Sequence, residues 1–115
     1  MHSFTSCLMH CVWATKERQP LIKPQLSSRL WAYLGGIARE NKMKAIIVGG
    51  AQDHAHLLLS IPSTLCTAKA IQLLKGNSSK WVHETFKELW QFEWQQGYGA
   101  FSISVSGHQG HGEIH

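Results

Sequence analysis

The sequence predicts one α+β domain of the ferredoxin-like type, in which two helices cover one face of an antiparallel sheet. The chain has 115 residues, which suits a single domain with its own hydrophobic core. It contains no internal repeat and no linker-like stretch. Its hydrophobic pattern alternates between the period of a strand and that of a helix in the order β-α-β-β-α-β. We therefore expect one domain over residues 1–106, followed by a short tail.

The first half of the domain predicts strand, helix and strand. Residues 3–15 (SFTSCLMHCVWAT) are apolar on both alternate faces and lack Gly and Pro, which indicates a central strand. Residues 24–41 begin with a proline, which suits the first turn of a helix, and their leucines recur with helical spacing. Residues 43–49 (MKAIIVG) predict a second strand that ends at two glycines.

The second half predicts strand, helix and strand again. Residues 54–61 alternate in polarity and are followed by a proline, which ends the strand. A second helix is expected over residues 65–88, with Ser63 or Thr64 as its N-terminal cap. The stretch 96–105 (QGYGAFSISV) predicts the last strand.

The charge and the cysteines narrow the class of protein. Eleven Lys and Arg against seven Asp and Glu give a net charge of +4 and a pI of about 9.2, which suits a polyanionic partner without requiring one. The sequence shows no transmembrane run and no signal peptide pattern. Three cysteines, Cys7, Cys11 and Cys66, are an odd number. We expect a reduced, cytoplasmic protein without a membrane partner.

Two histidines begin the third predicted strand. Within residues 54–61, His54 and His56 fall on one face, and the alternate positions are all apolar. Because the apolar positions must pack against the helices, the histidines lie on the opposite, open face. Two imidazoles at this spacing can converge on one metal ion. This spacing alone leaves two hypotheses, a divalent-metal site and a pair of structural histidines. Asp53 has the opposite parity, so we do not expect it to be a ligand.

Four stretches carry a more specific signal. They are MHCVWATKERQPLI, GGAQDHAHLLLSIP, LLKGNSSKWVHE and WQQGYGAFSISVS, in this order between about residues 5 and 106. Together they resemble the single-tyrosine HUH transposases, which mobilise small insertion sequences or act at repeated extragenic palindromes. The resemblance implies a ferredoxin-like fold, a homodimer, and a single-stranded DNA hairpin as partner. It also implies DNA transposition, by cutting and rejoining DNA through a 5′-phosphotyrosine.

The resemblance also assigns the histidine pair. His54-Ala55-His56 matches the family's His-hydrophobic-His motif, whose histidines hold a divalent metal ion. Mg²⁺ prefers oxygen ligands, whereas imidazole suits Mn²⁺ better. We therefore expect either Mg²⁺ or Mn²⁺ as the cofactor, held by His54 and His56.

The sequence departs from the family at its nucleophile. The family tyrosine lies on a C-terminal helix and is followed by a glutamine that can be a third metal ligand. Here residues 107–115 (GHQGHGEIH) contain Gln109 but no tyrosine and no helical period. We expect a disordered tail, left by truncation or a shifted reading frame, and a chain without its own nucleophile. Of the remaining tyrosines, Tyr33 borders the core stripe of its helix, so Tyr98 is the candidate substitute, with a structural role as its alternative.

Two polar groups are candidate DNA contacts. Lys16 and Arg18 lie in a stretch that resembles the family's TKxR pattern. A second group surrounds Gly76-Asn77 and consists of Lys75, Ser78, Ser79 and Lys80. Lysine charge and hydroxyl donors suit a phosphate backbone. A solvated surface is the alternative for both groups.

Three functions remain open at this stage. The first is a DNA strand transferase, and the second is a catalytically inactive hairpin-binding module that co-dimerises with a full-length relative. The third is an RNA-binding domain, which we rank last because residues 54–61 lack the aromatic side chains on which such domains stack bases. Trp90 and Trp94 are expected in the core or a dimer interface rather than on bases, and His10 is expected to be buried.

Overall fold

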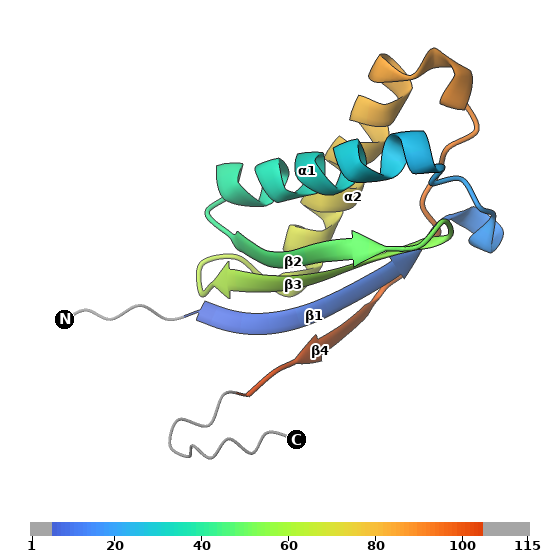
Figure 1. Cartoon of the computed structure of the whole chain (residues 1–115). Helices are drawn as coiled ribbons and strands as arrows, with labels where there is room; N and C mark the ends of the chain where they lie inside the picture. Colours follow the sequence, from blue (N-terminus) through green and yellow to red (C-terminus); the bar gives the residue numbers. More distant parts are fainter. Residues whose placement is uncertain (1–5, 105–115) are drawn as a thin grey trace.

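The computed structural model describes residues 6–104 and confirms the predicted α+β fold. Both helices lie on the same side of one sheet (Figure 1). The elements are β1 (Ser6–Ala14), η1 (Lys16–Arg18), α1 (Pro24–Glu40), β2 (Lys44–Gly50), β3 (His54–Pro62), α2 (Thr67–Thr85), η2 (Lys87–Leu89) and β4 (Gly99–Ser102). The tail predicted for residues 107–115, including Gln109, lies outside the described residues.

The sheet has the strand order β2-β3-β1-β4 and is antiparallel throughout. The first strand is central, as its sequence predicts. Its register with β3 pairs Val12 with His56 and Ala14 with His54. On its other side, Val12 pairs with Gly99 of β4. The histidines therefore lie at the start of an inner strand, next to the residues that β1 places on the same face.

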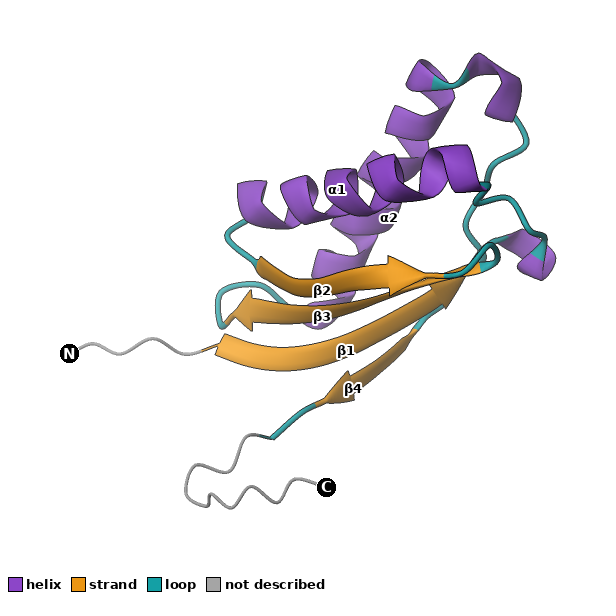
Figure 2. Ribbon diagram, in the orientation of Figure 1, coloured by secondary structure: helices purple, strands orange, loops and turns teal. Residues whose placement is uncertain are grey.

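The core fills the space between the sheet and the two helices (Figure 2). The four alternate residues of β3 are at most 2% exposed, which confirms that this face packs against the helices; they are Ala55, Leu57, Leu59 and Ile61. Each helix contributes a row of fully buried side chains, Leu26, Leu30 and Leu34 from α1 and Ala70, Ile71 and Leu74 from α2. Within residues 6–104 neither helix combines the length and apolar character needed to cross a membrane.

The second helix is shorter than its sequence predicts at both ends. It begins at Thr67, after Cys66 as its N-cap, and no side chain caps it. The proposed caps Ser63 and Thr64 lie before it, in the turn that leaves β3. Its C-terminal end is at Thr85, where the chain turns into η2.

The last strand begins three residues later than predicted because a bulge precedes it. Trp94 bridges to Thr15, and Gly99 pairs with Val12. Four residues, 95–98, therefore lie opposite the two residues Trp13 and Ala14. We call residues 95–98 the β4 bulge. Gly97 has a φ of 91° within it, a conformation that side chains with a Cβ rarely adopt.

Candidate metal centre

The two histidines of β3 lie on the face of the sheet that the helices leave open. The ring centres of His54 and His56 are 6.1 Å apart, with 27° between the ring planes. A third imidazole, that of His10 on β1, has its ring centre 5.7 Å from that of His56. It is partly exposed rather than buried as expected. Three imidazoles therefore gather on this face.

The carboxylate of Asp53 holds one of these rings. Its Oδ1 lies 2.9 Å from Nδ1 of His54, and its Oδ2 lies 3.4 Å from Nη2 of Arg18. An ionised carboxylate only accepts hydrogen bonds, so Nδ1 donates and Nε2 of His54 is left for a ligand. The hydrogen bond from His54, and also the charge of Arg18, lower the pKa of the Asp53 carboxyl. Asp53 thus contacts a candidate ligand instead of being one.

Two glycines shape the hairpin that carries the pair. The N–H of Ala51 donates to the carbonyl of His54 over 2.9 Å, which closes the turn. A Cβ on Gly50, whose φ is 153°, would overlap that carbonyl. Gly49 pairs with His56, and nothing lies within 4 Å of the place where its Cβ would be. Gly50 permits the tight turn, and Gly49 leaves open space beside His56.

The spacing of the two rings lets both reach one divalent ion only from nearly opposite sides. A metal-bound imidazole has its ring centre about 3.2 Å from the ion, so two rings on one ion have centres at most about 6.4 Å apart. The observed 6.1 Å is within this limit. Within residues 6–104 no three His, Cys, Asp or Glu side chains form a metal-binding group. The chain therefore offers two imidazoles, and the remaining ligands of an ion would be water or substrate oxygens.

Tyr98, in the β4 bulge, lines two cavities, one of about 350 Å³ beside Ile71 and Lys75 of α2 and a second beside β1. It is 46% exposed and lines a cavity of about 400 Å³. Val12, which pairs with His56, lines the same cavity, so the cavity reaches the residue next to the histidine site. Arg18 and Phe101 also contribute to its wall. Of the two tyrosines, Tyr33 instead stacks on Trp81 of α2, with ring centres 4.4 Å apart, and so joins the two helices.

The predicted DNA contacts on α2 are divided between structural and exposed positions. Nζ of Lys75 donates to the carbonyls of Gln95 and Gly97, over 2.7 and 2.9 Å, and burial lowers its pKa. Ser78 is fully buried, and its hydroxyl accepts from Nε1 of Trp94 over 3.0 Å. Lys75 therefore holds the β4 bulge, and Ser78 holds Trp94, the residue that precedes it. Neither side chain is free for a phosphate.

The remaining basic candidates are accessible but scattered. Lys80 is exposed on α2, 3.8 Å from Glu84, and the neighbouring Ser79 is partly exposed. Lys16 is exposed on η1, 3.5 Å from Glu93. Figure 2 shows α2 on one side of the sheet, and the histidines alternate with the β3 residues that pack on that side. Of these candidates, only Arg18 is linked to the histidine site, through Asp53.

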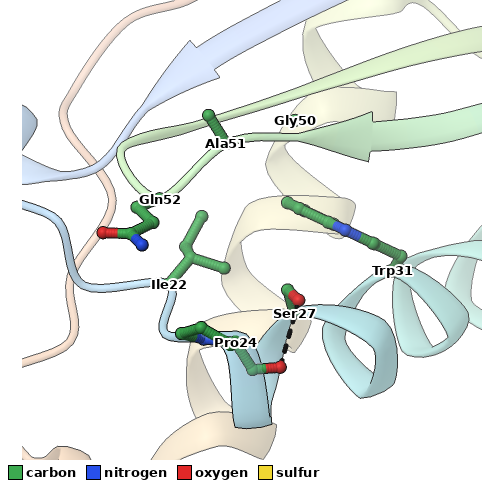
Figure 3. Close-up of a pocket in the computed structure, with 7 residues that line it drawn as sticks. All are labelled: Ile22, Pro24, Ser27, Trp31, Gly50, Ala51 and Gln52. Atoms are coloured by element: carbon green, nitrogen blue, oxygen red, sulfur yellow. Dashed lines mark hydrogen bonds between the residues drawn. The ribbon is translucent and has the colours of Figure 1, made fainter.

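A further cavity, of about 200 Å³, lies between the start of α1 and the tip of the β2–β3 hairpin (Figure 3). It is lined by Ile22, Pro24, Ser27, Trp31, Gly50, Ala51 and Gln52, none of which titrates. The N–H of Ile22 donates to the carbonyl of Gln52 over 2.9 Å. This cavity therefore lies where the hairpin tip is hydrogen-bonded to the connection that precedes α1, and none of its lining side chains titrates.

Comparison with known proteins agrees with this fold. The family model described as "Transposase IS200 like" matches residues 3–110. The transposases for insertion sequence element IS200 of Salmonella typhimurium and Salmonella typhi are each 26% identical to the chain over 88 residues. These matches cover 76% of the chain but only 58% of each relative, so the chain spans little more than half of their length.

Two solved structures share the fold. An inferred transposase of Deinococcus radiodurans R1 superposes with a TM-score of 0.81 at 22% identity, over 90% of this chain and 84% of that one. A REP-associated tyrosine transposase bound to a REP hairpin superposes with a TM-score of 0.63 at 12% identity, over 93% and 62%. Since the family model covers nearly the whole chain, the protein belongs to the IS200-like transposase family.

Proposed function

We propose that this chain provides the metal-binding and DNA-binding scaffold for cleavage and rejoining of single-stranded DNA in transposition. The observation that carries the proposal is the pair His54 and His56, side by side on the open face, with His54 oriented by Asp53. Family membership supplies the reaction class. The neighbour solved with a REP hairpin supports a hairpin of single-stranded DNA as the partner of this chain.

The pair would hold the ion through neutral imidazole nitrogens. A bound Mn²⁺ or Mg²⁺ would polarise the scissile phosphate and stabilise the departing 3′-oxygen. In the chain itself, Asp53 keeps Nδ1 of His54 protonated and Nε2 available. Gly49 leaves the neighbouring space free for a phosphate group.

Tyr98 is the candidate substitute for the family nucleophile, with a structural role as its alternative. Attack by its phenolic oxygen on phosphorus would form the O–P bond of a 5′-phosphotyrosine, while the bond to the 3′-oxygen breaks and that oxygen takes up a proton. Its position in the cavity beside Val12 supports this role, because the same cavity borders the strand pair that carries His56.

A second candidate is an inactive hairpin-binding module that co-dimerises with a full-length relative. The observation that favours it is the contact of Lys75 with the β4 bulge. Its ammonium binds the carbonyls of Gln95 and Gly97, which limits how far Tyr98 can move toward the histidines. The two candidates differ only in whether the chain forms a covalent bond with DNA.

We further propose a homodimer that covers the open face. Four apolar side chains are 40–61% exposed there or at its edge, namely Ile46, Ile47, Phe101 and Ile103. Ile46 and Ile47 belong to β2, whereas Phe101 belongs to β4 and Ile103 follows it, so these side chains lie at the two edges of the sheet. DNA contacts are proposed for the exposed Lys16, Arg18 and Lys80 and for the partly exposed Ser79. Because three of these residues are cationic, binding should weaken as salt is added.

One assay tests the proposal and separates its two forms. A labelled single-stranded hairpin is incubated with the chain and Mn²⁺, and covalent adducts are resolved on a denaturing gel. His108, His111 and His115 are replaced in all samples, so that they cannot capture metal. An adduct that is lost in Tyr98→Phe establishes Tyr98 as nucleophile. Hairpin binding without an adduct establishes the inactive module. If neither the hairpin nor Mn²⁺ is bound, the proposed function is wrong.

A further inference from the structure

The turn after β1 contains two residues in an unfavourable backbone conformation. Glu17 has φ 55° and ψ 23°, and Arg18 has φ 54°. Side chains with a Cβ avoid this left-handed region, and neither residue is one of the types that enter it readily. Such a conformation persists only where the surrounding structure imposes it, and it is most frequent at functional sites.

Several contacts impose it here. Thr15 is fully buried, and its N–H donates to the carbonyl of Asp53 over 2.9 Å. Its hydroxyl lies 2.6 Å from the carbonyl of Gln19 and 3.1 Å from that of Asp53. From the other side, the N–H of Glu17 donates to Oε1 of Gln95 over 2.7 Å. The turn that presents Arg18 is thus fastened to the backbone of Asp53 itself.

The side chain of Asp53 also connects this turn to the histidine pair. Oδ2 of Asp53 lies 3.4 Å from the guanidinium of Arg18, and Oδ1 lies 2.9 Å from Nδ1 of His54. The three side chains are linked in the order Arg18, Asp53, His54. The Arg18 side chain is 64% exposed, whereas those of Asp53 and His54 are 32% and 30% exposed. The guanidinium therefore approaches one oxygen of the carboxylate, while the other faces the ring.

His56 provides a contrast within the same strand. Among the described residues it has ring contacts with His10 and His54 but no hydrogen bond. A neutral imidazole without partners favours the proton on Nε2. The two histidines are therefore expected in opposite tautomers, with the proton on Nδ1 in His54 and on Nε2 in His56.

We propose that Arg18 and Asp53 are a positioning pair that fixes the His54 imidazole with its proton on Nδ1 and its Nε2 free on the open face. The strained turn is retained because it presents Arg18 to Asp53. The consequence for metal affinity rests on the proposed function, but the tautomer of His54 can be measured without metal or DNA.

The decisive measurement is nitrogen-15 NMR of the histidine rings in the metal-free chain, at a pH above the imidazole titration range. The parent should show His54 protonated on Nδ1. In Asp53→Ala the proton should move to Nε2, and in Arg18→Gln the two tautomers should mix. Lys16→Gln is the matched control, because it removes the same charge from the same turn but Lys16 lies against Glu93. The control should leave His54 unchanged, and His56 should not change in any variant.

Two results would overturn the positioning pair: His54 protonated on Nε2 in the parent, or His54 unchanged in Asp53→Ala. If Asp53→Ala fails to fold, Asp53→Asn replaces it, since the weaker acceptor should also shift the tautomer toward Nε2. Mn²⁺ titration then tests the consequence. Loss of the carboxylate should weaken binding about 10–100-fold. A parent that binds no Mn²⁺ would count against the proposed function, while the tautomer alone decides the role of Arg18 and Asp53.

Discussion

Lys75 and Gly97 are joined across the fold by a hydrogen bond of 2.9 Å from Nζ to the glycine carbonyl. A second bond from the same ammonium, 2.7 Å long, reaches the carbonyl of Gln95. The β4 bulge is therefore held from α2, on the side away from the open face. This contact sets where Tyr98 and the following strand lie.

The first prediction concerns this clamp. Lys75→Met should lower the free energy of unfolding by about 1–3 kcal/mol, because two carbonyls lose a charged donor. Urea denaturation measures the change. Lys80→Met is the matched control on the same helix, since Lys80 is exposed and its contact with Glu84 is a surface ion pair. Equal effects of the two substitutions would contradict the clamp.

The second prediction concerns the glycines of the hairpin. Gly50→Ala should destabilise the fold by about 1–3 kcal/mol, because its Cβ would overlap the carbonyl of His54 and force the strand to move. Gly49→Ala should be tolerated, since open space surrounds that position. Urea midpoints of the two variants provide the comparison. A stable Gly50→Ala variant would show that the turn is looser than described.

The third prediction uses the cysteines. Cys7 and Cys66 are exposed, whereas Cys11 is buried and burial raises the pKa of its thiol to about 11 from an ordinary value of 9.0. A thiol reagent should therefore modify two cysteines quickly in the native chain, and the third only after unfolding. Three equal rates in native buffer would contradict the packing of β1.

The same shift predicts a pH dependence of stability. Because the folded pKa of Cys11 is raised, its contribution is fully present below about pH 9 and is lost as the pH rises toward 11. The shift corresponds to about 3 kcal/mol at the alkaline limit. Between pH 9 and 11 the free energy of unfolding, measured by urea titration, should fall less for Cys11→Ala than for the parent. If the stability of the parent and of Cys11→Ala falls equally over this pH range, Cys11 is not the cause of the alkaline loss.

The fourth prediction tests the proposed dimer. Ile47→Glu places a charge on the open face and should weaken self-association at least about tenfold. Trp90→Glu is the control. Trp90 is 72% exposed, so it is not in the core, one of the two places expected for it, and it follows η2 outside the sheet. Sedimentation velocity over a range of concentrations gives the result. A parent that remains monomeric at every concentration would end the proposal.

The residues of β3 show how far sequence periodicity reaches. Its alternation placed Ala55 and Leu57 in the core and the histidines opposite, and the structure agrees, because one side of that strand must meet the helices. The same parity argument set Asp53 aside as a ligand and missed its contact with His54. Asp53 lies in the turn before the strand, where a period of two no longer fixes side-chain direction.

The β4 bulge escaped prediction for a different reason. Residues 96–105 have a strand-like composition, but their register depends on a lysine more than twenty residues earlier. The buried state of Ser78 depends in the same way on Trp94, 16 residues along the chain. The hydrophobic pattern of a short stretch of sequence does not indicate which distant residue its side chains contact. Gly97 was the one local signal, since glycine inside a predicted strand often marks a bulge.

The candidate site is built mainly from one β-hairpin, formed by β2 and β3 over residues 44–62. Gly49, Gly50, Asp53 and both histidines belong to it. Contacts between neighbouring segments form quickly, whereas β1 must wait for β3, whose paired residues lie 40 to 56 positions later. During synthesis on the ribosome, both imidazoles and their carboxylate can therefore assemble as one unit once residue 62 has emerged, and Arg18 joins when β1 docks. Folding kinetics should accordingly show that the β2–β3 hairpin closes before β1 docks and Arg18 reaches Asp53.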